Sequence, residues 1–471
     1  MPAKETISGH DLRARGWRAS PALGDALRAA KRALKRGMGR EEIFQSLDSV
    51  RESPDEWTGD ALFGKCARCL VADRRDEIEH PAPREVPLPC AVWGEEGIDR
   101  ATRDQMDAAC RLPVAAAAAL MPDGHVGYGL PIGGVLATRG AVIPHAVGLD
   151  IACRMRLSVV DLDTEQLPRL REPLRHALTS ETRFGVGAGF EKRKIRHHDV
   201  MDDALWGELA MPNRESLRDL AWRQLGTSGA GNHFVEFGDV EIHEGVGDIA
   251  PGRHVALLSH SGSRGLGAQI AQHFTRLAMR RCPLPGAMKH LAWLTLDSEE
   301  GEAYWLAMTL AGRYAQANHE LIHRHVLRGA GLDPILAVEN HHNFAWIEEH
   351  GGEEVVVHRK GATPAGEGML GFIPGSMATP GFLVRGRGNR ESLCSAAHGA
   401  GRAMSRRAAK DTISRAAWDE ALGRAGVELI AGGRDEAPQA YKDIREVMEA
   451  QRDLVEVVAT FHPRLVLMAG S

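Results

Sequence analysis

The sequence has no apolar run long enough to span a membrane, and its first residues, Met-Pro-Ala-Lys-Glu-Thr, lack the apolar segment of a secretory signal. The first absence excludes a transmembrane helix from the expected structure. The second gives no reason to expect export. We therefore expect a protein of the cytoplasm that has no membrane partner.

Cysteine is scarce, with seven residues in 471, and the cysteines are widely spaced. This pattern excludes the disulfide framework of small secreted domains and fits a reducing compartment. Cys66-Ala-Arg-Cys69 has the spacing of two zinc ligands, but no second Cys or His pair follows closely. A structural role and a zinc site both stay open for this pair.

An excess of positive charge is also missing, because 58 Lys and Arg stand against 63 Asp and Glu and give a net charge of -5. The whole chain is therefore not expected to attract nucleic acid, and any RNA site has to be a local patch. One stretch without acidic residues contains Arg28, Lys31, Arg32, Lys35, Arg36 and Arg40. It is either a solvated helix face or a contact for nucleic-acid phosphates.

Residues 1–83 are expected to form a small N-terminal helical module that directs the protein to RNA. Apolar residues recur at helical spacing from Pro21 to Val50, and Gly37-Met38-Gly39 marks a break between two helices. The proline-rich segment Pro81–Pro89 predicts a stiff linker.

Residues 84–471 are expected to form one compact α+β core, because no internal repeat is visible and strands and helices do not alternate regularly. The expected strands and apolar runs are Val114–Leu120, Gly133–Thr138, Met155–Val160, Val355–Val357 and Phe382–Val384. The expected helices are Leu174–Ala177, Ala204–Leu220, Ala268–Met279, Ser298–Arg328, His398–Lys410 and Ile444–Ala459.

The most informative motif is Gly148-Leu-Asp-Ile-Ala-Cys-Arg-Met155, in which Asp150 and Cys153 stand three residues apart. A carboxylate and a thiolate that face one cleft can share a metal centre, and the thiolate can bridge two ions. Alone, the motif also fits a buried structural cysteine.

Five loops share a composition of Gly, Ser, Asn and His, at residues 121–129, 226–234, 259–265, 339–343 and 395–402. Glycine lets a backbone approach a ligand closely, and backbone N–H groups in such loops can hold phosphate oxygens. The loops also supply histidines to the Asp150 and Cys153 pair.

His233, His260 and His342 would complete a dinuclear centre with Asp150 and Cys153. We expect Cys153 to bridge, with Asp150 and His233 on one ion and His260 and His342 on the other. Such a ligand set suits Mn, Zn, Fe or Co, and two ions can neutralise charge at both the attacking and the leaving atom of a phosphoryl group.

His398 is the candidate nucleophile, because a neutral imidazole can approach an anionic phosphate without repulsion and form a phosphoramidate. An ordinary role in capping a helix is the alternative. The cations in or beside these loops that could hold phosphates of a nucleotide or a strand end are Arg264, Arg359, Lys360 and Arg402.

Seven motifs, in this order, make the chain similar to the RtcB family of RNA ligases: Gly-Leu-Asp-Ile-Ala-Cys, Gly-Asn-His-Phe-Val-Glu, Ser-His-Ser-Gly-Ser-Arg-Gly-Leu-Gly, His-His-Asn, His-Arg-Lys-Gly-Ala-Thr-Pro-Ala, Ile-Pro-Gly-Ser-Met and His-Gly-Ala-Gly-Arg. The run Asp-Glu-Ala-Pro-Gln-Ala-Tyr-Lys-Asp-Ile at 435–444 also matches. The resemblance covers about residue 85 to the C-terminus, so the N-terminal module lies outside it.

The resemblance implies an enzyme of RNA repair or tRNA splicing that joins an RNA 3′-phosphate or 2′,3′-cyclic phosphate end to a 5′-hydroxyl end, using GTP and two Mn²⁺ ions. It places the five ligands named above on the family's metal ligands, and His398 on the histidine that becomes guanylylated. The positions it places against the guanylate are Asn232, His233, Phe234, Val235, Glu236, His342, Asn343, Pro374, Gly375, Ser376, Met377, His398, Gly399, Ala400 and Gly401. Arg264 and Arg402 are the candidates for contacts with RNA phosphates.

Three positions depart from the family pattern. Arg154 stands where the family has glycine, and we expect it to bring bulk and positive charge beside the bridging thiolate. Gly381 or Pro380 replaces a serine, and Ala469 replaces a lysine that helps to hold the guanylate. Two alternatives follow: a metal-dependent RNA cyclic phosphoesterase that has lost GTP use, and a non-catalytic RNA-binding relative.

Overall fold

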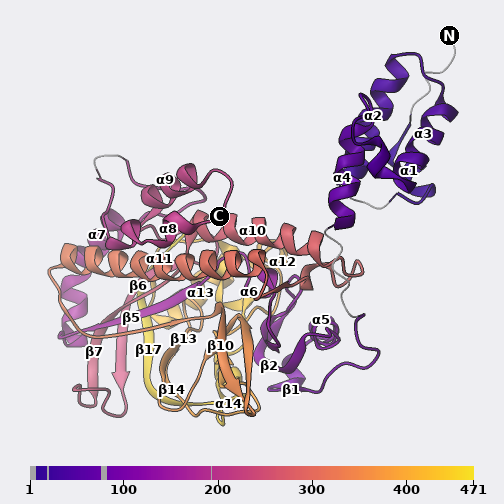
Figure 1. The fold of residues 1–471 in the computed structure, drawn as a ribbon. Coiled ribbons are helices and arrows are strands. Elements are labelled where there is room, and N and C mark those ends of the chain that lie inside the picture. The colour runs from indigo at the N-terminus through magenta and orange to yellow at the C-terminus, as the bar shows by residue number, and fades with distance from the viewer. Residues whose placement is uncertain (1–6, 18–20, 76–81, 192–193, 471) are drawn as a thin grey trace. The chain divides into compact units, whose positions relative to one another are not determined.

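The computed structural model describes residues 7–17, 21–75, 82–191 and 194–470, and the chain divides into two compact units (Figure 1). The first unit comprises Met1–His80 together with Arg280–Cys282, and the second comprises Pro81–Met279 and Pro283–Ser471. In the described part of the chain, no helix is long and apolar enough to cross a membrane.

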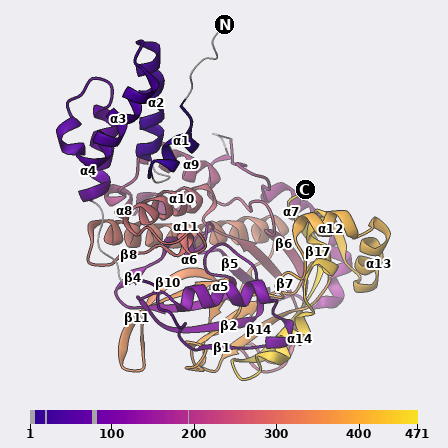
Figure 2. The same ribbon diagram turned by 90° about the vertical axis from the view of Figure 1, so that its right-hand side faces the viewer.

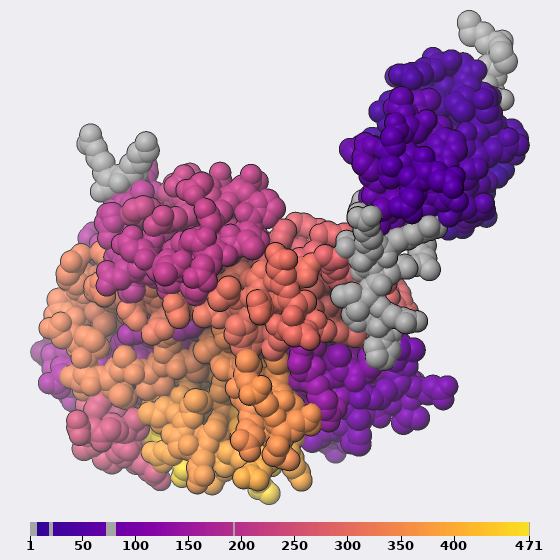
Figure 3. All heavy atoms as spheres, viewed as in Figure 1, coloured from indigo at the N-terminus to yellow at the C-terminus, as the bar shows by residue number. Residues whose placement is uncertain are grey.

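The N-terminal unit is helical and has a hydrophobic core of its own. Its helices are α1 (Gly9–Ala14), α2 (Pro21–Lys35), α3 (Arg40–Glu52) and α4 (Gly64–Arg75). Alanines of α2 share one buried cluster with Ile43, Leu47 and Val50 of α3. Gly37, with a φ of +87°, separates α2 from α3 as the sequence predicts. The atoms of this unit fill a compact volume (Figure 3, indigo).

Two sheets form the centre of the second unit. The smaller one has the strand order β1-β2-β3-β11-β10. Its strands are β1 (Cys90–Val92), β2 (Ala115–His125), β3 (Ile132–Thr138), β10 (Asn343–His350) and β11 (Glu353–Lys360).

The larger sheet has the order β13-β14-β17-β6-β7-β5-β9, and β16 also pairs with β17. Its strands are β5 (Arg154–Val160), β6 (Phe234–Ile242), β7 (Gly252–Ser261), β9 (Pro334–His341), β13 (Leu370–Ile373), β14 (Gly381–Gly386), β16 (Glu428–Ala431) and β17 (Val455–Met468). Two short pairs accompany the sheets: β4 (Ala141–Val142) with β8 (Leu294–Thr295), and β12 (Ala362–Pro364) with β15 (Ser395–Ala397).

Helices cover the sheets, and Figures 1 and 2 show α10 and α11 running side by side over them. The helices are α5 (Arg100–Cys110), α6 (Pro144–Val147), α7 (Leu167–Glu181), α8 (Leu205–Glu208), α9 (Arg214–Gln224), α10 (Arg264–Arg281), α11 (Glu299–Ala330), α12 (Arg406–Thr412), α13 (Arg415–Ala425) and α14 (Ile444–Ala450). The long helix α11 begins where Ser298 accepts a hydrogen bond from the backbone N of Gly301, and it ends at Gly331, with a φ of +69°.

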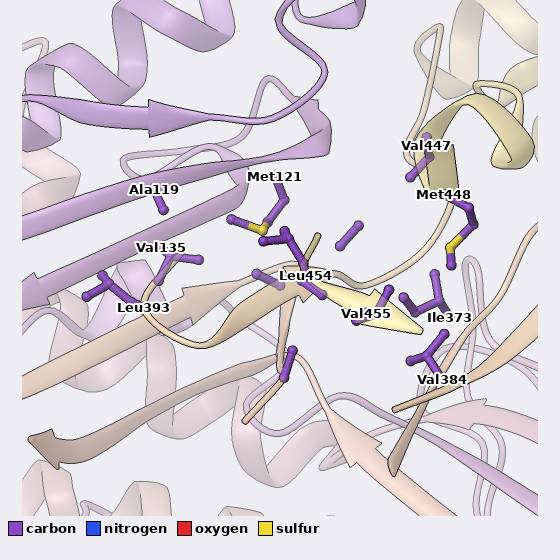
Figure 4. Close-up of a cluster of buried hydrophobic side chains, with 14 of the residues drawn as sticks. Ala119, Met121, Val135, Ile373, Val384, Leu393, Val447, Met448, Leu454 and Val455 are labelled. Atoms are coloured by element: carbon purple, nitrogen blue, oxygen red, sulfur yellow. The ribbon is translucent and has the colours of Figure 1, made fainter. Parts of the chain in front are cut away.

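A cluster of buried hydrophobic residues packs between the two sheets. Met121 of β2 and Val135 of β3 meet Val384 of β14 and Val455 of β17 in this cluster, and Figure 4 shows their side chains between the strands. A second cluster joins the larger sheet to α7 and α11 through residues such as Phe237. The mixed, compact architecture confirms the predicted α+β fold.

Two of the expected helices are shorter in the structure than the sequence predicted. The run from Ala204 to Leu220 forms two helices, α8 and α9, separated by Pro212 and by Asn213, which has a φ of +59°. The run from Ile444 to Ala459 is helical only as far as Ala450, and the β-branched residues that follow form the start of β17.

The helix expected to open at His398 is absent, since α12 begins only at Arg406. Residues 398–402 form a loop in which Gly401 has a φ of +72°. A Cβ atom on Gly401 would lie 2.2 Å from the carbonyl oxygen of Asp123, so the loop has to hold glycine there to make this close approach.

Candidate metal centre and nucleotide pocket

Four of the residues predicted as metal ligands lie at the ends of neighbouring strands in the larger sheet. Cys153 directly precedes β5, His233 directly precedes β6, and His342 directly follows β9. His260 is the penultimate residue of β7. In an antiparallel sheet the start of one strand lies beside the end of its neighbour, and the register here pairs Phe234 with His260 and Arg154 with His341. Residues distant in sequence therefore meet at one place.

The side chains face one another closely enough to share metal ions. The Sγ atom of Cys153 lies 3.5 Å from Nε2 of His233 and 3.1 Å from Nε2 of His260. Nε2 of His233 lies 3.0 Å from Oδ2 of Asp150, and Nε2 of His260 lies 3.3 Å from Nε2 of His342. The thiol thus stands between an Asp150–His233 pair and a His260–His342 pair.

Three of these residues meet the distance requirement for one shared ion. The ligand atoms of Cys153, His233 and His260 all lie within 4.8 Å of one another, and all three residues are buried. They form the only such group of three or more among the residues that the structure describes, so Cys66 and Cys69 belong to no cluster of this kind there. The buried group could hold a metal ion.

Burial and neighbouring charges favour the metal-binding forms of two imidazoles and of the carboxyl group, whereas burial and the charge of Asp150 raise the pKa of the Cys153 thiol, which a metal ion would have to deprotonate. Burial lowers the pKa of His260 to about 3, and it lowers the pKa of His342 well below its usual range. Burial by itself would raise the pKa of Asp150, but the hydrogen bond to His233 and the charge of Arg264 bring it to about 2. At neutral pH the two imidazoles are therefore neutral and the carboxyl group is ionised.

Hydrogen bonds turn the ligand atoms toward the centre. Nδ1 of His260 lies 3.1 Å from the backbone oxygen of Asn232 and donates to it, which leaves Nε2 free for a metal. The backbone N–H of Ser263 donates to Oδ1 of Asp150 over 3.1 Å. A guanidinium nitrogen of Arg264 lies 3.3 Å from Nδ1 of His233. These contacts orient His260, Asp150 and His233, whereas the buried Nδ1 of His342 has no hydrogen-bond partner among the described residues.

His398 lies beside this cluster, with its ring centroid 5.0 Å from that of His342. Its Nδ1 lies 2.5 Å from Oδ2 of Asp123, and its backbone N lies 3.1 Å from the same oxygen. The Asp123 side chain is fully buried. When Nδ1–H donates to this carboxylate, Nε2 carries the free lone pair and can act as a nucleophile.

Asp123 and its support were missed from the sequence. Asp123 lies in the loop at 121–129, whose composition was noticed, but no property of that loop indicated a partner for His398. The Nζ of Lys442 donates to the backbone oxygens of Pro122 and Gly124 over 3.1 and 2.7 Å. Lys442 therefore holds both neighbours of Asp123 in place.

A cavity of about 300 Å³ opens onto His398 and all five metal candidates. Eleven further positions predicted to contact the guanylate line it: Asn232, Phe234, Glu236, Asn343, Pro374, Gly375, Ser376, Met377, Gly399, Ala400 and Gly401. Val235 does not, because side chains alternate along β6 and Val235 points into the core with no exposed surface. Burial raises the pKa of the Glu236 carboxyl group well above its usual range.

A group of charged side chains lies at another wall of the cavity. Arg402 lies 3.3 Å from a carboxylate oxygen of Glu436, and Arg406 lies 2.9 Å from a carboxylate oxygen of Asp435. Tyr441 donates its hydroxyl to Glu436. Arg402 was predicted from the sequence, whereas Arg406, Glu436 and Tyr441 were not, although the run at 435–444 was noticed.

Three of the four cations predicted to hold phosphates do not line the cavity: Arg264, Arg359 and Lys360. Arg359 is 1% exposed and lies 2.6 Å from a carboxylate oxygen of Glu348. Lys360 donates to the backbone oxygens of Tyr128 and His145 over 2.5 and 3.0 Å. The side chains of Arg359 and Lys360 are held in the interior by protein groups, so neither faces the cavity where a phosphate would bind.

The expectation for Arg154 is also wrong. Its side chain forms an ion pair with Glu339 and donates to the backbone oxygen of Gly312 over 3.2 Å. Glu339 also lies 2.6 Å from Arg156, two residues along the strand. Since neighbouring side chains point to opposite faces of a strand, Arg154 lies on the face away from the thiol of Cys153.

The other two departures lie near the cavity. Gly381 lines it, and a Cβ atom there would lie 2.6 Å from the ring of Phe372, so the ring occupies the space a serine would need. Ala469 follows β17 directly and is 8% exposed. The residue before it, Met468, lines the cavity.

The comparisons with known proteins agree with this geometry. The family model described as tRNA-splicing ligase RtcB matches residues 105–469. The RNA-splicing ligase RtcB of Escherichia coli K12 is 38% identical, over 73% of this chain and 87% of its own length. The RNA-splicing ligase RtcB of Mycobacterium tuberculosis is 35% identical over 73% and 94%, and the tRNA-splicing ligase RtcB of Thermococcus kodakarensis is 32% identical over 73% and 86%.

Proposed function

The chain belongs to the RtcB family of RNA ligases, and from this premise we propose that residues 84–471 join RNA ends with GTP and two Mn²⁺ ions. The ends would be a 3′-phosphate or 2′,3′-cyclic phosphate and a 5′-hydroxyl. The enzyme would act in RNA repair or tRNA splicing in the cytoplasm. The observation that carries the proposal is His398, which lies beside the ligand cluster with Nδ1 held by Asp123 and Nε2 free.

The ligand geometry supports a two-metal centre. Asp150 and His233 would hold one ion, His260 and His342 the other, and the Cys153 thiolate would lie between them, since each pair already touches and Cys153 contacts one member of each. Bound ions would neutralise negative charge on phosphoryl oxygens. The set of one carboxylate, one thiol and three imidazoles suits Mn²⁺ and several other first-row metals.

His398 would carry the guanylate. Its Nε2 attacks the α-phosphorus of GTP, an N–P bond forms, the bond to the β-phosphate oxygen breaks, and pyrophosphate leaves. Asp123 stabilises the positive charge that develops on the imidazole ring, because it accepts the Nδ1–H hydrogen bond. The chain supplies position and charge here, which are the main requirements of phosphoryl transfer.

The later steps use the same centre. Water opens a cyclic phosphate to a 3′-phosphate, whose oxygen then takes the guanylyl group from Nε2 of His398. The 5′-hydroxyl oxygen attacks the activated 3′-phosphorus, and GMP leaves with the electron pair. Arg264, which lies next to His233, and Arg402, which lines the cavity, are proposed to hold RNA phosphates.

Glu236 supports guanine as the base. Its carboxyl group is 3% exposed and lines the cavity, and it forms no ion pair with any residue that the structure describes. Burial favours the protonated form of this carboxyl group in the free chain, and two neighbouring N–H groups of a guanine edge would favour the ionised form by donating hydrogen bonds to it. The replacement of a lysine by Ala469 favours a second candidate function, a metal-dependent RNA cyclic phosphoesterase without GTP use.

The test is a pair of assays on the full chain with Mn²⁺. Incubation with α-labelled GTP should give a covalent adduct that is stable to denaturation and absent in His398→Ala. An RNA with a cyclic phosphate and a 5′-hydroxyl partner should be joined only when GTP is added. Opening of the cyclic phosphate without adduct or joining would replace the ligase with the phosphoesterase. Loss of all three reactions, with two ions bound, would leave a non-catalytic relative.

A further inference from the structure

The N-terminal unit carries a stripe of exposed cations along one helix. Arg28, Lys31, Arg32 and Lys35 of α2 are all exposed. Their spacing of three, one and three residues places all four on one side of an α-helix, where residues three and four apart are neighbours. The sequence predicted a helix face in this stretch, and the structure shows that these four side chains are exposed on it.

The packing of α2 keeps its cationic face directed toward solvent. The other side of α2 presents the alanines at positions 22, 26, 29, 30 and 33, and each of them has no exposed surface. They belong to the same buried cluster as Ile43 and Leu47 of α3. Rotation of α2 about its axis would expose this apolar side, so the cations stay directed to solvent.

The neighbouring helix α4 widens the stripe. Arg32 donates to the backbone oxygen of Leu62 over 3.1 Å, just before α4 begins. Lys65 of α4 is exposed, and its Nζ lies 3.4 Å from Oδ1 of Asp25. Arg28 donates to the same oxygen over 2.7 Å. Lys65 therefore lies next to Arg28, and the positive face spans two helices.

Neutralisation of this face is incomplete. Asp25 is a single carboxylate, 8% exposed, shared by two cations. Lys31 and Lys35 form no hydrogen bond or ion pair with any residue that the structure describes. The exposed carboxylate of Asp60, near the start of α4, accepts hydrogen bonds from the backbone N–H groups of Leu62 and Phe63. The face therefore keeps a positive excess within a chain whose net charge is -5.

We propose that this α2/α4 face binds the phosphate backbone of the RNA substrate. The proposal rests on the ligase function proposed above, since that function supplies the RNA. A row of cations neutralises successive phosphates and releases their counterions, without reading sequence. The family match begins at residue 105, so this contact is an addition to the part of the chain shared with the family.

RNA fits the face better than a membrane or an apolar protein surface does. Among its described residues, the N-terminal unit exposes no large hydrophobic side chain. Membrane-surface helices need apolar residues that enter the lipid, and protein interfaces need an apolar centre. A face of cations without such residues suits a polyanion.

The test measures RNA affinity of the full chain across salt concentrations. The variant Lys31→Glu/Lys35→Glu changes two exposed side chains that support no packing. We expect the Kd for an RNA hairpin with an added single strand to rise about tenfold near 0.1 M salt, and the slope of log K against log salt to fall by about 1 to 2. Lys31→Arg/Lys35→Arg should keep the wild-type affinity and slope.

The matched control is Arg424→Glu/Arg452→Glu, which makes the same charge change on the second unit, where these side chains are 73% and 80% exposed. It should lower RNA affinity much less than the α2 variant does. Equal losses in the two variants, or an unchanged affinity in the α2 variant, would overturn the proposal. Tight binding to anionic phosphatidylserine vesicles that depends on Lys31 and Lys35, without RNA binding, would overturn it in favour of a membrane contact.

A third measurement separates this proposal from the ligase proposal. Formation of the His398 adduct from labelled GTP needs no RNA, so the α2 variant should form it at the wild-type rate. If the adduct forms and the RNA affinity does not depend on Lys31 and Lys35, the proposal for the α2/α4 face is rejected and the ligase proposal stands. RNA binding that depends on them, without any adduct, would reject the ligase function alone.

Discussion

Oδ2 of Asp123 lies 2.5 Å from Nδ1 of His398 and 3.1 Å from the backbone N of the same residue. One carboxylate oxygen therefore fixes both the ring and the backbone of the proposed nucleophile. The contact also selects the tautomer, because a carboxylate accepts Nδ1–H and leaves the lone pair on Nε2.

Asp123→Asn should slow formation of the guanylyl adduct by about 100- to 10,000-fold, because an amide can present an N–H to Nδ1 and favour the wrong tautomer. The measurement is the single-turnover rate with labelled GTP and saturating Mn²⁺. The number of bound ions should stay at two, since Asp123 touches none of the proposed ligands. A wild-type rate in this variant would remove Asp123 from the mechanism.

Lys442→Met should slow adduct formation about tenfold, because the backbone oxygens of Pro122 and Gly124 lose a charged donor and Asp123 is held less firmly. Lys442→Arg should restore part of the rate. The loss should appear in the rate constant at saturating GTP, with little change in the GTP concentration for half-maximal rate. If the nucleotide affinity alone changes, Lys442 contacts the nucleotide and does not act through Asp123.

His342→Ala should reduce the bound manganese from two ions to one per chain, as measured by elemental analysis after gel filtration, because His342 is proposed to hold only one of the ions. His341→Ala is the matched control. The His341 ring packs at 5.1 and 4.9 Å from those of Phe344 and Trp346 and lies outside the ligand cluster. It should keep two ions, and equal loss in both variants would argue against the assignment.

Glu339→Gln should lower the free energy of unfolding by about 3 to 5 kcal/mol, because Arg154 and Arg156 would both lose their buried counter-charge. The double variant Arg154→Leu/Glu339→Gln should recover part of the loss, since one uncompensated charge is gone. Denaturant midpoints of the four proteins in the cycle give the coupling. Simple addition of the two single effects would show that the pair does not interact.

Lys360 should make stability depend on pH. Burial lowers the pKa of Lys360 from 10.5 to about 7 in the folded chain. Between those values the unfolded chain binds a proton that the folded chain lacks, so the free energy of unfolding rises with pH, by up to about 1.4 kcal/mol per unit. Below pH 7 both states carry the proton and this contribution is flat.

The measurement compares urea midpoints of the wild type and Lys360→Met between pH 7.5 and 9.5. The difference between the two proteins isolates Lys360 from other groups that titrate in this range. The wild type should gain stability relative to the variant as the pH rises. Parallel curves would show that Lys360 keeps its proton in the folded chain.

The sequence predicted the α+β class and the RtcB family, and both are confirmed. It also predicted Asp150, Cys153, His233, His260, His342 and His398 as one site. Motifs of this kind can be recognised in a sequence because only a few residue types serve as metal ligands and nucleophiles. The structure brings these six side chains together, and their roles stay proposals until they are tested.

Contacts between chemically ordinary residues could not be predicted. Asp123 belongs to a glycine-rich turn that resembles many others, and only the folded chain places it against His398. The direction of Arg154 depends on which face of β5 is covered, and its distant partner Glu339 gave no sign of the pairing. The helix expected at His398 failed because a close approach of Gly401 to Asp123 outweighs local helical preference.

The position of the metal ligands at the ends of separate strands has a consequence for how the protein matures. Residues 150 to 342 supply them, and they meet only after β5, β6, β7 and β9 have paired across long stretches of chain. A partly synthesised or partly folded chain therefore lacks the complete set of proposed ligands. Metal could bind at this centre only after the four strands have paired. An ion bound at the proposed centre would stabilise the folded chain only when these four strands are paired, and it would then raise resistance to heat and proteases.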